Sequence, residues 1–509
     1  MYLIDKSNQI EFEDFYLPFA GKLRNDNRWV ILSKQIPWEH IEQKYSSHFS
    51  NSSNAGCPAK SARVALGALI IKERLGLTDR ETVHQIAENP YLQFFLGFSE
   101  YKNELPFDHS LMTHFRKRFD KETLASINVL IIDKAMKRDN VSQEPSDDDK
   151  NLPSNKGKLI VDATCTPADV AYPTDLNLLN EAREKTEAMI DTMHAPYVGQ
   201  RKKPRTYRHK ARKSYLAVAK QKKSSYKKVR KAIGKQLRYL RRNLRNIGTM
   251  SSAGLLVHLS NKQYRNLLVI KELFRQQQLM YESRSYKILD RIVSISQPHL
   301  RPIVRGKAKN NVEFGAKVSV SLVDGFSFVD RISWDNYNES CDLIDQIESY
   351  YKRFGYYPKS VHADKIYRTR DNRAFCKTRR IRLSGPPLGR PKKVIESNAE
   401  QLKQAKKQHR QDEVDRIAIE GKFGQGKRRF SLARVMAKLA KTSEVVIMVS
   451  FMVMNLEKIL SSFLSFFLYM WQWLQVVACH VRHISTRYSL WIRNSLWTRI
   501  LSIKMLQFE

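Results

Sequence analysis

The sequence predicts an α/β protein whose sheet is interrupted once by a long helical insertion and is preceded by an all-helical segment. Two observations indicate this class. Short apolar runs with strand character alternate with helix-like segments, and a long basic helical stretch separates the first run from the others. The expected strands cover 158–164, 312–323, 326–334, 360–363 and 381–383. With 509 residues, the chain is long enough for about three domains.

Residues 1–136 are expected to form a helical N-terminal domain. Apolar residues recur at helical spacing over 62–75, and Gly76 is placed to end that helix. A basic helix is expected over 111–119, which favours a DNA reader of the helix-turn-helix kind. A small helical packing or dimerisation domain is the alternative. The candidate DNA contacts of this domain are Arg116, Lys117 and Arg118.

A polar, aperiodic stretch at 137–157 predicts a linker, and a basic helical insertion is expected over 174–310. Between Arg201 and Arg245 the chain carries 20 Lys or Arg and no Asp or Glu, and from Arg212 onward the pattern predicts one long helix. Twenty cations without an anion repel one another unless phosphates lie nearby, so we expect this segment to bind the DNA backbone. The candidate contacts are Arg201, Lys202, Lys203, Lys222, Lys223, Lys227, Lys228, Arg241 and Arg242.

The whole chain is strongly basic, with a formal net charge of +38 and a pI near 9.9. Such a charge favours an anionic partner; nucleic acid is the commonest one, and an anionic membrane surface is the alternative. The five cysteines are scattered and odd in number, which argues against a disulfide framework and a zinc site. Together with the absence of a signal-peptide pattern, this predicts a cytoplasmic protein.

The tail, 456–509, contains an uncharged run at 459–479 that is long enough to cross a bilayer. Serine and glutamine residues interrupt the run, and it follows directly on another apolar segment at 445–454. A buried or interfacial helix is therefore favoured, with membrane contact as the alternative. No membrane partner is expected.

Three acidic residues lie far apart in the chain, each in a setting that suits a metal-bound carboxylate. Asp162 and Asp364 follow short apolar strands, and Glu420 lies in a helix-like segment flanked by cations. Mg²⁺ prefers oxygen ligands and keeps several waters, so two or three carboxylates suffice to hold it. Two such ions can activate a nucleophile and neutralise the charge that develops on a phosphodiester. In a basic chain, this combination predicts metal-dependent chemistry on nucleic acid.

Arg416 lies four residues before Glu420, on the same face of the expected helix, and can orient that carboxylate or bind phosphate. The helix is expected over 395–420. Three glycines follow Glu420 and argue against its continuation, so Lys427 is placed on a loop that approaches DNA closely. Taken alone, each aspartate can be a turn former, and Glu420 can be half of a helix ion pair.

These features resemble the DDE transposases of bacterial insertion sequences, in the insertion sequence five family and its insertion sequence four relatives. The segment Pro58–Phe119 is similar to their N-terminal helical domain. Ile160-Val-Asp-Ala-Thr164 resembles their first catalytic strand, and His362-Ala-Asp-Lys-Ile-Tyr367 resembles the second. The most specific motif is the family's signature of Arg, three residues, Glu, six residues and Lys, matched here by Arg416, Glu420 and Lys427.

The chain departs from the family pattern in three respects. Glu413 stands where the signature usually has Tyr, and Ile366 stands where a glycine usually precedes the Tyr at 367. The 201 residues between Asp162 and Asp364 include the basic insertion and exceed the minimal core. The resemblance therefore says least about what that insertion does.

The resemblance implies a ribonuclease H-like catalytic core formed by 158–173 and 311–455. The catalytic residues that it implies are Asp162, Asp364, Glu420, Arg416 and Lys427, of which the three acids hold two Mg²⁺ or Mn²⁺ ions. It also implies binding of double-stranded DNA at terminal inverted repeats, hydrolysis that frees 3′-hydroxyl ends, and strand transfer into target DNA. Synapsis of two ends implies a homodimer or higher oligomer, acting in the bacterial cytoplasm at the nucleoid.

Two other classes of protein stay open. A ribonuclease H-like nuclease without strand transfer would use the same acidic site. A non-catalytic DNA-binding protein derived from a transposon would not need that site, and the intact acidic trio argues against it.

Overall fold

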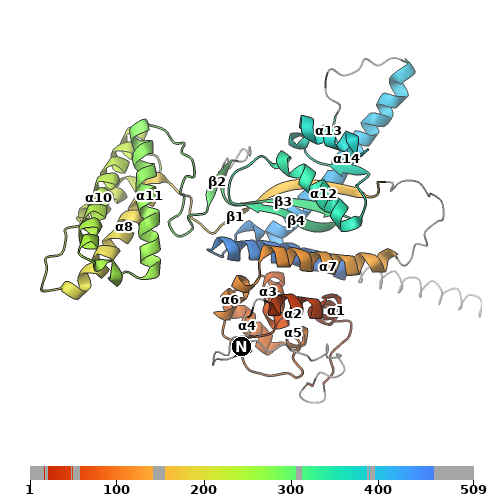
Figure 1. The fold of residues 1–509 in the computed structure, drawn as a ribbon, viewed down its shortest axis with the longest axis horizontal. Helices are drawn as coiled ribbons and strands as arrows, with labels where there is room; N and C mark the ends of the chain where they lie inside the picture. Colours follow the sequence, from red (N-terminus) through yellow and green to blue (C-terminus); the bar gives the residue numbers. More distant parts are fainter. Residues whose placement is uncertain are drawn as a thin grey trace, which may run out of the picture.

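The computed structural model describes residues 16–17, 21–47, 49, 58–140, 155–304, 312–386, 389 and 396–462. Three parts are distinct in the ribbon: N-terminal helices, a mixed sheet with its flanking helices, and a helical insertion that lies apart at one end (Figure 1). The predicted α/β class, with a helical N-terminal region and a single helical insertion in the sheet, is confirmed.

The sheet has six strands, and β1 lies at its centre. The strands are β1 (Lys158–Pro167), β2 (Arg301–Val304), β3 (Val312–Val323), β4 (Phe326–Ser333), β5 (Ser360–His362) and β6 (Arg382–Leu383). β1 pairs antiparallel with β3 on one side and parallel with β5 on the other, and β6 adds to β5 in parallel. Both β2 and β4 pair antiparallel with the other edge of β3. The sheet therefore resumes at residue 301, inside the range predicted for the insertion.

Helices connect the parallel strands and cover the sheet, as parallel pairing requires. The flanking helices are α12 (Leu343–Phe354), α13 (Arg370–Thr378), α14 (Glu396–Arg429) and a last helix, Ala440–Ser462. Of the described helices, Ala440–Ser462 is the one long and apolar enough to cross a membrane. However, 72% of its most apolar window is buried, and Ile447, Phe451 and Leu456 belong to the main core. Most of the uncharged run predicted at 459–479 lies outside the described residues.

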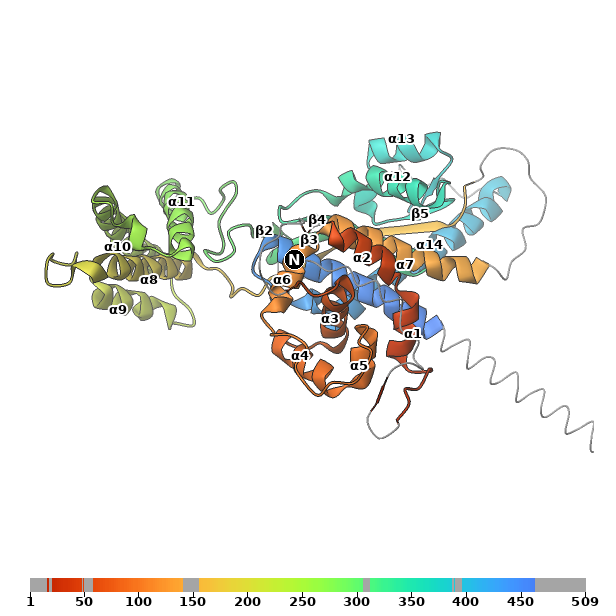
Figure 2. The ribbon, with the colours of Figure 1, turned by 60° about the horizontal axis from the view of Figure 1, so that its bottom comes forward.

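The N-terminal helices pack onto the sheet layer. The last of them, α7, lies with Ala440–Ser462 between the other N-terminal helices and the sheet (Figures 1 and 2). The N-terminal helices are α1 (Arg28–Gln35), α2 (Trp38–Ser46), α3 (Ala62–Leu75), α4 (Asp79–Glu88), α5 (Pro90–Phe95), α6 (Leu111–Arg118) and α7 (Lys121–Asn140). As predicted, Gly76 ends α3 with a left-handed φ of 68°. One buried apolar cluster includes residues of these helices and of the sheet.

A buried carboxylate also ties the N-terminal helices to the rest of the protein. Glu73 of α3 is 3% exposed and accepts hydrogen bonds from the backbone and hydroxyl of Ser431, at 2.6 and 2.8 Å, and from the Ser450 hydroxyl, at 2.6 Å. Such bonds to a buried charge are strong, and leaving the charge unpaired is costly. The N-terminal helices are therefore a fixed part of the sheet domain.

The insertion is a four-helix unit with its own apolar core, built from residues between 178 and 295. Its helices are α8 (Asp175–His194), α9 (Arg208–Ala219), α10 (Tyr226–Ser252) and α11 (Asn261–Ser283). The prediction of one long helix from Arg212 onward is wrong, because α9 ends at Ala219 and α10 begins at Tyr226. The break lets both helices pack on α8.

The close approach of β3 to β1 gives a test of this sheet. A Cβ atom on Gly315 would collide with the Thr166 carbonyl, because β3 is paired at this point with both β1 and β2. We expect Gly315→Ala to destabilise the protein by about 2 kcal/mol, as overpacking does. The free energy of unfolding in urea, followed by circular dichroism, measures the change.

Gly248→Ala is the matched control, because no atom of the described residues lies within 4 Å of a Cβ at that position in α10. It is expected to leave the protein equally or slightly more stable, by up to about 1 kcal/mol. Equal stability of the two variants would contradict the β1–β3 pairing.

Candidate active site and nucleic-acid interface

The pairing of β1 and β5 brings two of the predicted acids together. Ile160 of β1 is in parallel register with His362, the last residue of β5; Asp162 lies two residues further along β1, and Asp364 follows two residues after β5 ends. Each carboxylate accepts a hydrogen bond from the next backbone amide, at 2.8 Å for Asp162 and 2.7 Å for Asp364. The charge of Asp364 contributes to raising the pKa of Asp162, as expected for two carboxylates at neighbouring strand ends.

Burial raises the pKa of Asp162 to about 6, and Arg416 lowers it by a smaller amount. The ionised form loses hydration in this place and gains few compensating charges. Perturbed carboxyl groups of this kind are concentrated at functional sites. Asp162 is therefore held in an environment that a bound cation would relieve.

Helix α14 packs against β1 and β5, and ion pairs with the first residues of β1 and β6 fix it there. Lys158 of β1 contacts Asp415 at 2.7 Å, and Arg382 of β6 contacts Asp412 at 2.6 Å. His362, which the sequence indicates to be structural, is fully buried and lies 3.7 Å from Asp412. These contacts hold the part of α14 that precedes Arg416 against the sheet.

Arg416 and Glu420 form an ion pair one helical turn apart, with Nη1 of the arginine 2.9 Å from Oε1 of the glutamate. Arg416 also lowers the pKa of Asp162, so its guanidinium lies within electrostatic reach of that carboxylate. The Glu420 side chain is 51% exposed and stays open to solvent or to a ligand. The helix salt bridge that was the alternative for Glu420 is thus present.

The predicted end of this helix at Glu420 is wrong. α14 runs to Arg429, so Lys427 lies in its last turn and not on a loop. Of the three glycines that suggested a break, Gly426 has a packing reason, because a Cβ there would press on Leu432. Two turns of helix, about 10 Å, separate Glu420 from Lys427 along roughly the same face.

The oxygen-only donor set fits a hard divalent cation such as Mg²⁺. Within the part of the chain that the structure describes, no group of three or more His, Cys, Asp or Glu side chains is closed around a metal position. Asp162 and Asp364 are adjacent, whereas Glu420 is turned to Arg416. A cation here would be held by two aspartates and waters, with Glu420 joining only after exchange of its ion pair.

Two residues near the site were missed or undervalued in the sequence. Glu339, in a short 3-10 turn (Glu339–Asp342), raises the pKa of Asp162 and pairs with Lys317 at 2.5 Å. No motif surrounds Glu339, so only the fold could reveal it. Tyr367 is fully buried, and burial together with the charges of Asp162 and Glu339 raises its pKa far above the usual range. Its hydroxyl has no hydrogen-bond partner among the described residues.

Two of the three DNA contacts predicted on α6 are occupied within the protein. Arg116 is buried and bidentate with Asp79, at 3.0 and 2.5 Å, so it is not available to DNA. Arg118 donates to the Tyr45 hydroxyl at 3.2 Å and stacks over Phe49. Of the three, Lys117 is exposed. The signal that misled here is the charge of α6, which partly serves the packing of the N-terminal helices.

The insertion, by contrast, places its cations outside. Between Arg201 and Arg245, every Lys and Arg is exposed except Arg208, Arg230 and Lys235. All nine predicted contacts in this segment are therefore on the surface, although Lys203 is also ion-paired with Asp191. Tyr207 supports one of them, with the guanidinium of Arg242 stacked 4.4 Å from its ring centroid.

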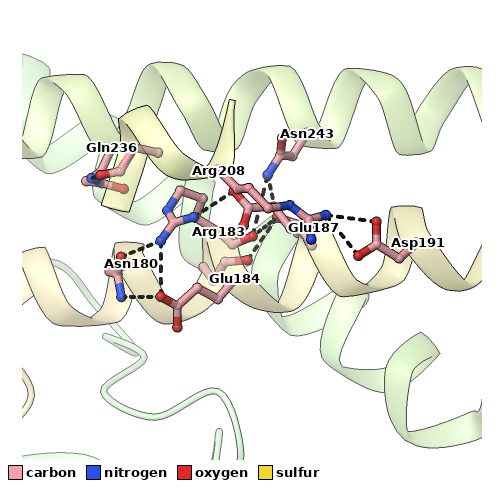
Figure 3. Close-up of polar contacts among 11 residues, drawn as sticks. Asn180, Arg183, Glu184, Glu187, Asp191, Arg208, Gln236 and Asn243 are labelled. Atoms are coloured by element: carbon pink, nitrogen blue, oxygen red, sulfur yellow. Dashed lines mark hydrogen bonds and ion pairs between the residues drawn. The ribbon is translucent and has the colours of Figure 1, made fainter. Parts of the chain in front are cut away.

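A polar network inside the insertion holds these surfaces in place (Figure 3). Arg183 of α8, 1% exposed, pairs with Glu187 at 2.6 Å and also contacts Asn180 and Glu184. Farther along α8, Asp191 accepts two 2.8 Å bonds from Arg208 at the start of α9. The buried Arg183–Glu187 pair thus stabilises α8 itself, and the half-exposed Asp191–Arg208 pair joins α8 to α9.

Comparison with known proteins gives this arrangement a family. Residues 361–457 match a model described as a transposase DDE domain, and residues 18–118 match one described as a transposase domain (DUF772). This chain belongs to the DDE transposases of insertion elements. The first match contains Asp364, Arg416 and Glu420, and it begins after the strand that carries Asp162.

The transposase also has a relative in Rhizobium meliloti, an uncharacterized protein named ORF8 in the nfe locus. The two are 30% identical over 153 residues, which is 30% of this chain and 68% of that protein. No solved structure matches the transposase significantly. DDE transposase domains generally use divalent metal ions, in keeping with the oxygen donors described above.

The raised pKa of Asp162 predicts a change of stability with pH. The folded protein keeps this proton to about pH 6, whereas the unfolded chain releases it near pH 3.8, so ionisation costs stability as pH rises through that window. We expect Asp162→Asn in metal-free buffer to stabilise the protein above pH 6 by up to about 3 kcal/mol, at about 1.4 kcal/mol per pKa unit. Urea unfolding between pH 5 and 8 measures the difference.

The difference in the free energy of unfolding between the Asn variant and the wild type should decrease toward pH 5, where the wild-type carboxyl is mostly protonated in the folded state. Added Mg²⁺ should stabilise the wild-type protein and not the variant. A constant difference across this pH range would show that Asp162 is not buried as described.

Proposed function

We propose that this transposase, as a member of the insertion sequence five family, binds the terminal inverted repeats of its element, cuts there and joins the freed 3′-hydroxyl ends to target DNA. The observation that carries the proposal is the parallel pairing of β1 with β5, which supports a shared site for Asp162 and Asp364, together with the Arg416–Glu420 pair on the neighbouring helix α14. The mixed sheet, with antiparallel strands on one side of β1 and parallel strands on the other, supports a ribonuclease H-like core.

Asp162, Asp364 and Glu420 would hold two Mg²⁺ or Mn²⁺ ions. Such ions, when bound, activate the attacking water or hydroxyl and neutralise the phosphate charge. Before the ions bind, the ion pair with Arg416 keeps Glu420 on the site face of α14. When the glutamate turns to the cations, the Arg416 guanidinium can bind a phosphate oxygen instead. Lys427, two turns further along the helix, supplies a second positive contact to the DNA backbone.

The insertion supplies the grip on double-stranded DNA. Its exposed cations are not balanced by acids in the same segment, and release of counterions from DNA provides the free energy of such binding. Phosphate contacts orient a duplex without reading its sequence. Recognition of the inverted repeats would therefore come from other surfaces, with the exposed Lys117 of α6 as one contact. Holding two ends together requires a homodimer or higher oligomer.

Loss of either aspartate is expected to abolish cleavage of DNA that carries the element's own ends. Asp162→Ala and Asp364→Ala each remove a ligand of the proposed ions, so single-turnover cleavage in Mg²⁺ should fall by at least about 1,000-fold, the scale of a lost charge-stabilising group. Affinity for the same DNA should stay within about threefold, because neither residue lies on the basic surface.

Asp371→Ala is the matched control, since Asp371 is an exposed acid at the start of α13 outside the site. It should cleave normally. Cleavage that survives in both aspartate variants would refute the proposed site. Cleavage without joining of the cut end to a second duplex would identify a nuclease in place of a transposing enzyme.

Removal of exposed lysines from the insertion is expected to weaken DNA binding in a salt-dependent way. Changing Lys222, Lys223, Lys227 and Lys228 together to Ala should lower affinity for a duplex of unrelated sequence by 10-fold or more in low salt. The slope of log K against log salt should become shallower by about 0.9 for each phosphate that the variant no longer neutralises. Fluorescence anisotropy over a salt series measures both quantities.

Lys352→Ala with Lys377→Ala serves as the control, because these lysines are exposed on α12 and α13, outside the insertion. An unchanged salt slope in the four-lysine variant, or an equal change in the control, would show that the DNA-binding surface lies elsewhere.

A further inference from the structure

A cavity of about 300 Å³ lies at the end of the insertion that faces the sheet. Its walls come from the linker before α8, the start of α10, and the end of α11 with the loop that follows. The residues that matter are Tyr226, Tyr281, Tyr286, Arg230, Arg284 and Arg291. The volume is at the small end of the range that holds small ligands or single groups of larger ones.

The rim of this cavity carries aromatic rings that are unusually exposed. Tyr226 is 54% exposed, Tyr286 is 59% exposed, and their ring centroids lie 6.5 Å apart at an edge-to-face angle of 66°. Tyr172, on the linker from β1, is 69% exposed and lines the same cavity. Three exposed aromatic rings around one opening present flat apolar surfaces for a flat ligand.

The cavity is also cationic. Arg230 stacks 4.3 Å from the ring of Tyr281 and donates to its backbone carbonyl at 2.7 Å, so its guanidinium is held at the wall. Asp175, an acid of the lining, is neutralised by Arg291 at 2.7 Å and accepts a further bond from Gln277 at 2.8 Å. The Nε of Arg291 is buried without a partner in the described structure.

The loop after α11 holds the third arginine in a conformation that costs energy. Arg284 ends α11 with a left-handed φ of 55°, and Asp290, six residues later, has a φ of 51°. Left-handed residues other than glycine are uncommon and occur preferentially at ligand-binding loops. This loop carries Tyr286, and Leu289 beside it is 89% exposed.

The opening continues directly into the basic surface. Lys227 and Lys228 follow Tyr226 on α10, and both are exposed, as are Lys222 and Lys223 in the preceding turn. A nucleic-acid strand that follows these cations reaches the tyrosines without leaving positive surface. Aromatic rings beside a cationic track bind unpaired bases of any sequence.

We propose that this cavity receives one unpaired nucleotide of the DNA, with its base against Tyr226 and Tyr286 and its phosphate on the arginines. The proposal rests on DNA being the substrate of the transposase. Tyr172 connects the cavity to the sheet, because the Tyr172 ring packs edge-on against Phe314 of β3, with the ring centroids 5.5 Å apart. A nucleotide in the cavity would therefore touch both the insertion and the linker that joins it to β1.

The test compares two duplexes of the same unrelated sequence, one fully paired and one with a single unpaired 2-aminopurine nucleotide. The wild-type protein should bind the second at least fivefold more tightly, and stacking should quench its fluorescence. Tyr226→Ala with Tyr286→Ala should remove both the preference and the quenching while affinity for the paired duplex stays within twofold. Tyr226→Phe with Tyr286→Phe should keep both, since stacking needs the ring and not the hydroxyl.

Thermal unfolding followed by circular dichroism shows that the Ala variant is folded. Equal affinity of the wild-type protein for the two duplexes, or an unchanged preference in the Ala variant, would overturn the proposal. The proposal would also be overturned if an acidic peptide displaced the duplex with the unpaired nucleotide from the tyrosines and deoxyadenosine monophosphate did not. Cleavage is not measured in this assay, so its outcome is separate from that of the aspartate variants.

Discussion

The parallel pairing of β1 with β5 is the contact on which the candidate site depends. Side chains alternate between the two faces of a sheet, so a slip of one residue would turn one aspartate away from the other. The register that sets Ile160 against His362 excludes that slip, and buried Val161 and Val361 on the strands stabilise it. The ion pairs of α14 with β1 and β6 then fix the position of α14, and with it that of Glu420, relative to these strands.

This arrangement places opposite charges in separate parts of the molecule. The sheet domain buries acidic groups around Asp162, where burial makes ionisation costly, and the insertion exposes cations that repel one another. Under the proposed function each part would be relieved by the other, since DNA on the cations would bring phosphates, and divalent ions would bind both the phosphates and the carboxylates. With a net charge of +38, the chain concentrates 20 cations and no acid between Arg201 and Arg245, so its basic surface is not uniform.

The sequence predicted the elements well and their ends and contacts less well. Periodic apolar patterns and Gly76 are local signals, and helices and strands follow from them. The continuation of α14 past Glu420 could not be read locally, because Gly426 is favoured there by packing against Leu432. Likewise, the burial of Arg116 depends on Asp79, and the approach of Glu339 to Asp162 depends on the fold of the whole sheet. Charge shows which residues can bind phosphate, and only tertiary contacts show which are already occupied.

A helical unit that carries so many exposed cations needs an independent source of stability, and the insertion has one. Its own apolar core is reinforced by the buried Arg183 network, in which the charges are paired with good geometry. Because that core is separate from the core of the sheet among the described residues, the unit can hold DNA while only two linkers connect it to β1 and β2. Strain from bound DNA would pass through those linkers. The cavity lined by Tyr172 and the loop after α11 lies at this joint, so a nucleotide bound there would couple the position of the insertion to β1, the strand that carries Asp162.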